Sequence, residues 1–298
     1  MDARPTPPFG EVLTAMITPF DSEGAVDYGT FWRLARHLVS NGSDGIVVTG
    51  TTGEAPTLTS IEKIALYKAA VDAVGDRASV IAGTGTYATK ESVELTEQAA
   101  EVGVDGILAV TPYYSKPPQE GLRRHFTAIA DATDLPVMLY NIPSRTARLI
   151  EVETLSALAE HPNIVAVKDA VEDLEHTRAA IAALPEGFAV YAGSDHMTKA
   201  IVEAGGVGVV SVASHLVGPQ IRRLVAAARD GDHGQAGKIH DALVPLFDAL
   251  FVEPSPMPVK AALDVLWDPV GVPRLPLVAA SEATLELIES ALEAAQAV

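Results

Sequence analysis

The chain has 298 residues, no cysteine, and 39 acidic against 21 basic side chains, which gives a formal net charge of −18. The lack of cysteine excludes disulfides, cysteine nucleophiles and cysteine-based metal sites. The acidic balance argues against nucleic acid and anionic membrane surfaces as partners. No apolar stretch is long enough to span a membrane, and the Pro-rich start MDARPTPPFG lacks the apolar core of a signal peptide, so we expect a cytoplasmic protein.

Short apolar segments rich in β-branched residues alternate with longer amphipathic segments along most of the chain. The segments expected to form strands are residues 12–18, 45–49, 79–83, 106–111, 136–141, 164–169, 188–193 and 208–212. Among the intervening helices, SIEKIALYKAAVDAV is predicted to be capped by Thr59 or Ser60, with Glu62 in its first turn. The apolar residues that fall on one face of this helix are Ile61, Ile64, Ala65 and Ala69.

Eight strands that alternate with helices predict parallel strands joined by right-handed crossovers, and therefore an α/β fold of the (β/α)8 TIM-barrel type. We expect residues 1–217 to form the barrel with its Pro-rich N-terminal arm. Residues 218–298 contain no further strand pattern and are predicted to form the last barrel helix and a C-terminal helical extension packed on the barrel. In such a barrel the active site lies at the C-terminal ends of the strands.

One lysine, Lys168, stands at the end of the apolar segment IVAVKDA. Withdrawal of a lysine from water lowers its pKa, and a neutral amine can attack a carbonyl carbon to form a Schiff base. The alternative is an ion pair with Asp169 or with a carboxylate on a neighbouring strand, and position alone does not separate the two. Tyr140, at the end of the preceding predicted strand, favours the Schiff base, because a phenol there can pass protons to and from the attacked carbonyl.

Other segments at the predicted strand ends offer polar groups, each with an ordinary structural alternative. TGTTGE presents backbone N–H groups and the hydroxyls of Thr51 and Thr52, which suit a carboxylate, although such a segment is as often a simple turn. Arg145 can bind a carboxylate through its planar fork of donors, or form a surface ion pair. Tyr113 and Tyr114 lie in TPYYSKPP, where packing is the commoner role of a tyrosine.

Three other kinds of site are disfavoured by the motifs. AGTGTYA matches a loose dinucleotide fingerprint, but the predicted strand after it does not end in an acidic residue, so we predict no NAD site. TGTTGE lacks the Gly-Lys-Ser/Thr of a phosphate-binding loop. The eight histidines show no metal-binding spacing, so we predict no metal site.

Five motifs occur in order along essentially the whole chain: GTTGEAPTL, VTPYYSKP, LYNIPSRT, AVKDA and FVEPSPMPVKAAL. Together they resemble the 4-hydroxy-tetrahydrodipicolinate synthase (dihydrodipicolinate synthase) family, in the superfamily of pyruvate-dependent class I aldolases that includes N-acetylneuraminate lyase. The resemblance implies condensation of pyruvate with L-aspartate 4-semialdehyde to 4-hydroxy-tetrahydrodipicolinate, the first committed step of lysine and diaminopimelate biosynthesis. It also implies no cofactor, since the covalent imine of pyruvate with the lysine is the electron sink, and a homotetramer built as a dimer of dimers.

The resemblance assigns roles to the matching positions of this chain. Lys168 would form the Schiff base and Tyr140 would donate and accept protons. Thr51 and Tyr114 would complete a proton relay, with Tyr114 reaching across a subunit interface. The residues implied in substrate binding are Thr51 and Thr52 for the pyruvate carboxylate, Arg145 for the carboxylate of aspartate semialdehyde, and Gly193 and Val210 for the pyruvate pocket through backbone atoms.

Two other functions stay open at this level. A sugar-acid lyase of the same superfamily is disfavoured by Arg145, which such lyases generally lack, and a catalytically silent scaffold barrel is disfavoured by the complete set of lysine, tyrosines and threonines. Inhibition by lysine is predicted to be weak or absent, since Lys63 places a cation close to where that inhibitor would bind. The positions that help to line the inhibitor site in sensitive members are here Ala55, Pro56, Ser60, Lys63 and Tyr87, with only Glu91 and Tyr113 retained.

Overall fold

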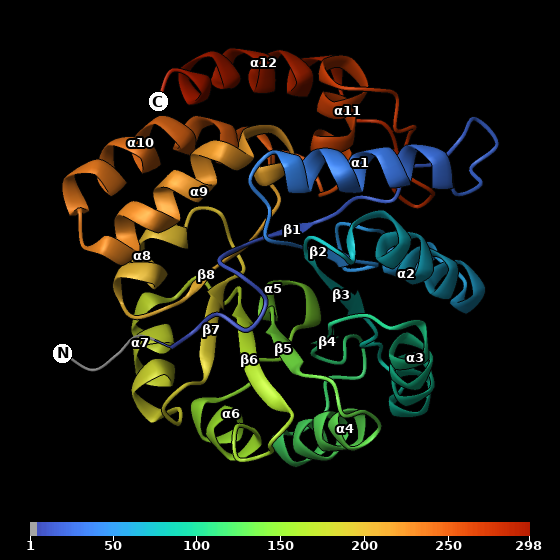
Figure 1. The fold of residues 1–298 in the computed structure, drawn as a ribbon, viewed down its shortest axis with the longest axis vertical. Helices are drawn as coiled ribbons and strands as arrows, with labels where there is room; N and C mark the ends of the chain where they lie inside the picture. Colours follow the sequence, from blue (N-terminus) through green and yellow to red (C-terminus); the bar gives the residue numbers. More distant parts are fainter. Residues whose placement is uncertain (1–4) are drawn as a thin grey trace.

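The computed structural model describes residues 5–298, and its centre is a closed barrel of eight parallel strands that pair in chain order (Figure 1). The strands are β1 (Val12–Ala15), β2 (Gly45–Val48), β3 (Ser79–Gly83), β4 (Gly106–Val110), β5 (Val137–Asn141), β6 (Ile164–Asp169), β7 (Ala189–Ala192) and β8 (Gly208–Ser211). β8 closes the barrel on β1, where Leu13 is the partner of Val210. The predicted (β/α)8 fold is confirmed, and each observed strand lies inside its predicted range.

Helices surround the strands on the outside of the barrel (Figure 1). They are α1 (Tyr28–Ser40), α2 (Ser60–Val74), α3 (Thr89–Val102), α4 (Gln119–Asp131), α6 (Val152–Leu158), α7 (Leu174–Ala183), α8 (Thr198–Glu203) and α9 (Ser214–Asp230). Two short elements, the 3-10 helix η1 (Ala55–Thr57) and α5 (Pro143–Thr146), lie in the segments that follow β2 and β5. The last helices, α10 (His233–Ala249), α11 (Met257–Leu266) and α12 (Glu282–Gln296), contact α9 and extend the helical layer on that side.

The barrel interior is filled by side chains and is closed at its N-terminal end. Because successive residues of a strand point to opposite faces, each strand contributes both to this inner cluster and to the larger core under the helices. At the closed end lies the buried ring of Phe9, and the Tyr191 hydroxyl donates a 2.9 Å hydrogen bond to the Gly10 carbonyl. A Cβ at Gly106 would lie 2.3 Å from the Phe9 ring, so only glycine fits there. Within residues 5–298 the N-terminal end of the barrel is therefore filled, which leaves the C-terminal ends of the strands as the place for a site.

Helix α2 confirms one local prediction and corrects another. Thr59 caps the helix, because its hydroxyl accepts from the Glu62 N–H while the Glu62 carboxylate accepts from the Thr59 N–H. The predicted buried face is wrong, since Ile61 is 80% exposed and the helix buries Leu66 and Tyr67 instead. Apolar residues occur all round this helix, so their spacing does not select a face, and packing against β2 and β3 does.

Candidate active site

A cavity of about 640 Å³, called the mouth cavity below, opens at the C-terminal ends of the strands. Its lining residues are Thr51, Thr52, Tyr140, Ile142, Ser144, Arg145, Lys168, Ala170, Glu172, Gly193, Ser194, His196, Met197, Val212, Phe251 and Ser255. The structure thus brings most of the predicted site residues to one place from four different strand ends. Val210 and Tyr114 do not line this cavity.

Lys168 lines the mouth cavity and lies next to Tyr140. The two residues are direct partners in the pairing of β6 with β5, and the Lys168 Nζ lies 4.1 Å from the centroid of the Tyr140 ring. Lys168 is only 5% exposed. Within residues 5–298 its amine forms no ion pair, so the geometry leaves it free to meet a ligand carbonyl placed in the cavity.

The Asp169 carboxylate does not form an ion pair with the Lys168 amine. The ion-pair alternative for Lys168 is therefore wrong for this neighbour. Neighbouring residues of a strand face opposite sides, so the Asp169 carboxylate points outward toward α7. There it accepts a 2.8 Å hydrogen bond from the Thr177 hydroxyl and a 2.9 Å bond from the Val171 N–H. Burial raises the pKa of the Asp169 carboxyl above its ordinary value, while these two donors oppose the shift.

Arg145 is carried to the cavity by the segment after β5. The side-chain amide of Asn141 bonds twice to the backbone of Ile150, with its Nδ2 donating at 3.1 Å and its Oδ1 accepting at 3.0 Å. This pairing draws the segment into a loop in which the short helix α5 presents the exposed Arg145. The Arg145 guanidinium forms no ion pair with the described residues, and its fork of donors is therefore available to a ligand carboxylate.

The threonine pair is held by a compact turn after β2. The Gly50 carbonyl accepts from the Ala55 N–H at 3.2 Å, and the Thr51 carbonyl accepts from the Glu54 N–H at 3.1 Å. Thr51 and Thr52 both line the mouth cavity, and Glu54 adopts a left-handed conformation with φ of 58°. The turn thus brings both threonines to the wall of the same cavity as Lys168.

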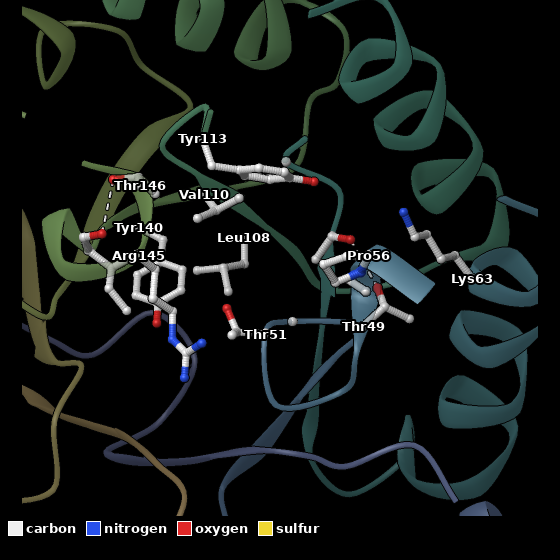
Figure 2. Close-up of a pocket in the computed structure, with 15 residues that line it drawn as sticks. Thr49, Thr51, Pro56, Lys63, Leu108, Val110, Tyr113, Tyr140, Arg145 and Thr146 are labelled. Atoms are coloured by element: carbon white, nitrogen blue, oxygen red, sulfur yellow. Dashed lines mark hydrogen bonds between the residues drawn. The ribbon is translucent and has the colours of Figure 1, made fainter. Parts of the chain in front are cut away.

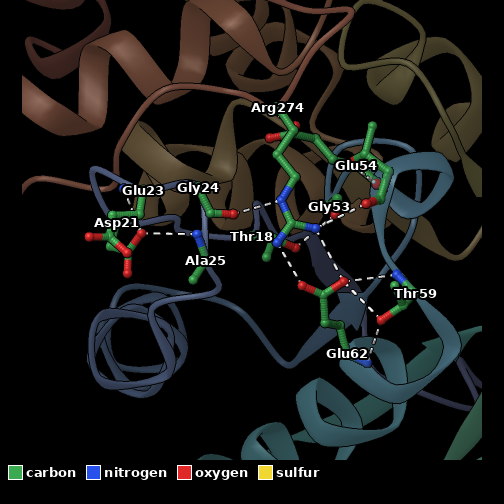
Figure 3. Close-up of polar contacts among 11 residues, drawn as sticks. Thr18, Asp21, Glu23, Gly24, Ala25, Gly53, Glu54, Thr59, Glu62 and Arg274 are labelled. Carbon is green, nitrogen blue, oxygen red and sulfur yellow. Dashed lines mark hydrogen bonds and ion pairs between the residues drawn. The ribbon is translucent and has the colours of Figure 1, made fainter.

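Two ion pairs support this turn, and neither was predicted from the sequence. Lys260 Nζ lies 3.0 Å from Glu54 Oε1, and both side chains are only 1% exposed. Arg274 binds Glu62 at 2.6 Å and donates from its backbone N–H to Glu54 at 2.9 Å (Figure 3). Glu54 lies in the motif GTTGEAPTL, and Lys260 lies in the motif FVEPSPMPVKAAL. The opposite charges of these two residues were the signal in the sequence from which the ion pair could have been predicted. The C-terminal helices therefore take part in shaping the site.

The ends of β7 and β8 are joined by a buried carboxylate. Asp195 accepts 3.0 Å hydrogen bonds from the N–H groups of Val212 and Ala213, and its pKa is raised by complete burial. Asp195 thereby links the turn that contains Gly193 to the start of α9. Val210 does not reach the mouth cavity, and its side chain belongs to the cluster that fills the interior of the barrel.

A second, smaller cavity of about 210 Å³, called the side cavity, adjoins the first. It shares Thr51, Tyr140 and Arg145 with the mouth cavity, and Figure 2 places Arg145 and Lys63 at opposite ends of it. Lys63 is buried, and its pKa is lowered by desolvation while Glu91 opposes the shift. Lys63, the residue expected to disfavour binding of lysine as an inhibitor, therefore lies in the wall of the side cavity, next to the active site.

Tyr114 is placed differently from the other predicted residues. It is 93% exposed, has a positive φ of 71°, and lines neither cavity of its own chain. Its neighbour Tyr113 does line the side cavity, where burial raises the pKa of the Tyr113 hydroxyl. Any role of Tyr114 at a reaction centre would therefore require a second subunit.

Residues 5–298 contain neither a metal-ligand cluster nor a helix that could span a membrane. No group of three or more His, Asp or Glu side chains in this part of the chain could hold a metal ion. None of the helices described there is both long and apolar enough to cross a bilayer.

The fold and this site define a (β/α)8-barrel enzyme whose cavity is lined by a buried lysine. Residues 8–295 match the model of the dihydrodipicolinate synthetase family. The chain is 52% identical over 286 residues to a 4-hydroxy-tetrahydrodipicolinate synthase from Thermosynechococcus vestitus, covering 96% of this chain and 97% of the relative. The chain belongs to the dihydrodipicolinate synthetase family, which confirms the resemblance carried by the five motifs.

Solved structures agree with this membership. A dihydrodipicolinate synthase from Bacillus anthracis superimposes with a TM-score of 0.93 at 46% identity, over 98% of this chain and 99% of that one. The enzyme from Cyanidioschyzon merolae, crystallised with lysine bound, gives a TM-score of 0.95 at 46% identity, over 98% of this chain and 100% of that one.

Proposed function

We propose that this enzyme condenses pyruvate with L-aspartate 4-semialdehyde to give 4-hydroxy-tetrahydrodipicolinate, the first committed step of lysine and diaminopimelate biosynthesis. The observation that carries the proposal is the buried Lys168 amine beside Tyr140, in a cavity that also presents two threonine hydroxyls and the Arg145 guanidinium. The relatives that are about half identical over nearly the whole chain carry the name of this synthase.

In the first half-reaction, Thr51 and Thr52 hold the pyruvate carboxylate and Lys168 attacks the keto carbon. Loss of water leaves a protonated imine, which withdraws electrons from the neighbouring methyl group. A methyl proton then leaves and an enamine forms, with Tyr140 passing protons between the reacting atoms. The imine itself is the electron sink, so the proposed chemistry calls for no cofactor. Backbone atoms of Gly193 and Val210 complete the pyruvate pocket in this proposal.

In the second half-reaction, Arg145 holds the carboxylate of aspartate semialdehyde at the cavity mouth. The enamine carbon forms a bond to the aldehyde carbon, whose oxygen takes up a proton. The substrate amine next attacks the imine carbon, which closes the ring and releases Lys168 as a free amine. Each turnover therefore consumes both substrates, releases water and regenerates the lysine.

Tyr114 enters this proposal through the assembly. Because it is exposed and outside both cavities of its own chain, we propose that it completes the proton relay with Thr51 and Tyr140 in a neighbouring subunit of a homotetramer arranged as a dimer of dimers. Sedimentation velocity of the wild type tests the assembly. Tyr114→Phe should reduce kcat without changing the oligomeric state, and a monomeric wild type with full activity would contradict this role.

The central experiment treats the enzyme with pyruvate and sodium borohydride and then maps the modified residue by mass spectrometry. A reduced pyruvate adduct on Lys168, together with condensation activity toward aspartate semialdehyde, is the expected result. Lys168→Ala should give no adduct at that position. An adduct without condensation, accompanied by cleavage of 2-keto-3-deoxygluconate, would instead indicate a sugar-acid lyase, and no adduct would indicate a non-catalytic barrel.

A further inference from the structure

Two oppositely charged side chains on the mouth cavity have no partner within residues 5–298. Arg145 and Glu172 both line the cavity and are exposed, and neither forms an ion pair or a side-chain hydrogen bond with the described residues. Among the other ionisable groups of the lining, Lys168 is assigned to the carbonyl of the first substrate, and His196 Nε2 lies 2.8 Å from Asp248. One positive and one negative group therefore remain available to a ligand.

The backbone holds Glu172 at this place in an unusual conformation. Its φ of 61° lies in the left-handed region, which is unfavourable for a residue with a Cβ. The loop is anchored on both sides, because Asp169 accepts from the Val171 N–H at 2.9 Å and Asp173 caps α7 through the Glu175 N–H at 2.9 Å. Glycine would adopt this conformation at a lower free-energy cost than glutamate. The loop therefore places a carboxylate at the cavity although the backbone conformation at this position favours glycine.

We propose that Glu172 binds the α-ammonium group of the second substrate and so selects an amino-acid aldehyde over aldehydes without the amine. The inference rests on the proposed function, in which Arg145 takes the carboxylate of the same molecule. A site with Lys168 and Arg145 alone would attract any small carboxylic acid, including a second pyruvate. Glu172 attracts the ammonium group and repels an additional carboxylate, so it adds discrimination through charge. The contact belongs to the binding step: the ammonium group then gives one proton to the solvent, and the neutral amine leaves Glu172 and attacks the imine carbon.

The test compares the charge on the protein with the charge on the ligand. Glu172→Gln removes the carboxylate charge and retains its size, and Glu175→Gln removes the same charge from an exposed position of α7 that does not line the cavity. The probes are aspartate semialdehyde as substrate and succinic semialdehyde, which has the aldehyde and carboxylate but no amine, as a competitive inhibitor.

Glu172→Gln should raise the KM for aspartate semialdehyde about two- to fivefold, the size expected for one partly exposed charge pair. It should leave the KM for pyruvate and the borohydride adduct on Lys168 unchanged, and it should not weaken inhibition by succinic semialdehyde. Glu175→Gln should match the wild type in all of these measurements. Glu172→Gly should raise the same KM while unfolding at no lower temperature than the wild type, which separates lost charge from a disrupted loop.

An unchanged KM for aspartate semialdehyde in Glu172→Gln would overturn the inference, as would an equal loss of affinity for both aldehydes. In either case a wild type that condenses pyruvate with aspartate semialdehyde would leave the proposed function standing. A wild type that forms no product from these two substrates would overturn the proposed function and the inference together.

Discussion

The buried ion pair behind the threonine turn permits a quantitative test of how the C-terminal helices support the active site. Lys260→Met keeps most of the apolar stem and deletes the ammonium group. In the wild type this group lies 3.0 Å from Glu54 Oε1, 3.0 Å from the Thr18 carbonyl and 3.3 Å from the Val272 carbonyl. After the substitution, the Glu54 carboxylate remains buried, and among residues 5–298 its remaining hydrogen bond is the one from the Arg274 backbone N–H.

Removal of one member of a fully buried pair costs about 3–5 kcal/mol, because the remaining charge has lost its partner and cannot reach water. Both members of this pair are 1% exposed, so Lys260→Met should lower the free energy of unfolding by about that amount. The double variant Glu54→Gln/Lys260→Met has no uncompensated charge and should recover at least half of the loss. In the same variants the KM for pyruvate should follow stability, since Glu54 belongs to the turn that presents Thr51 and Thr52.

Urea denaturation followed by circular dichroism, at one fixed protein concentration because subunit assembly affects the midpoint, measures these differences. Lys90→Met is the matched control, since Lys90 forms an i,i+4 pair with Glu94 with its side chain 90% exposed and should unfold like the wild type. If Lys260→Met came within about 1 kcal/mol of the wild type, or the double variant were no more stable than the single one, the burial argument would be refuted.

Three further results are expected. Arg274 lowers the pKa of Glu62 to about 2 from an ordinary 4.5, so the stability that Glu62 contributes is complete above about pH 4.5 and is lost as the pH falls toward 2. Urea curves of wild type and Glu62→Gln should therefore differ by about 1–3 kcal/mol at neutral pH and converge in acid, and a constant difference would contradict the assignment. Arg145→Ala should raise the KM for aspartate semialdehyde about 10- to 100-fold yet retain the pyruvate adduct on Lys168, and equal loss of both would contradict its role. Steady-state rates should change little with millimolar lysine because of the cation at Lys63, and inhibition at sub-millimolar lysine would show that this prediction is wrong.

Much of the fold was accessible from local patterns. The apolar segments that became strands are short, rich in β-branched residues and separated by helical periods, and these properties depend on neighbours only a few residues away. The rule that chemistry lies at the C-terminal ends of barrel strands then placed Lys168, Tyr140 and the threonine turn at one rim before any contact was known. These residues do line one cavity.

The errors and gaps concern choices that local patterns leave open. The spacing of Ile61, Ile64 and Ala65 suited a buried face of α2, but apolar residues on several sides let the barrel select a different one. The possible partnership of Lys168 with Asp169 could not be decided from adjacency, and the alternation of side chains along β6 in the folded barrel directs Asp169 toward Thr177.

The sequence by itself determined which strands form, where they begin to within one residue, and which reactive amine stands at a strand end, because hydrogen-bond ladders, caps and hydrophobic periods act over short distances along the chain. Only the tertiary structure decided which charges are paired and which are left for a ligand. Glu54 and Lys260 are 206 positions apart and meet only when the C-terminal helices pack on the closed barrel. Arg145 and Glu172 follow β5 and β6, and the pairing of these two strands brings both to the same cavity without a partner in the described chain.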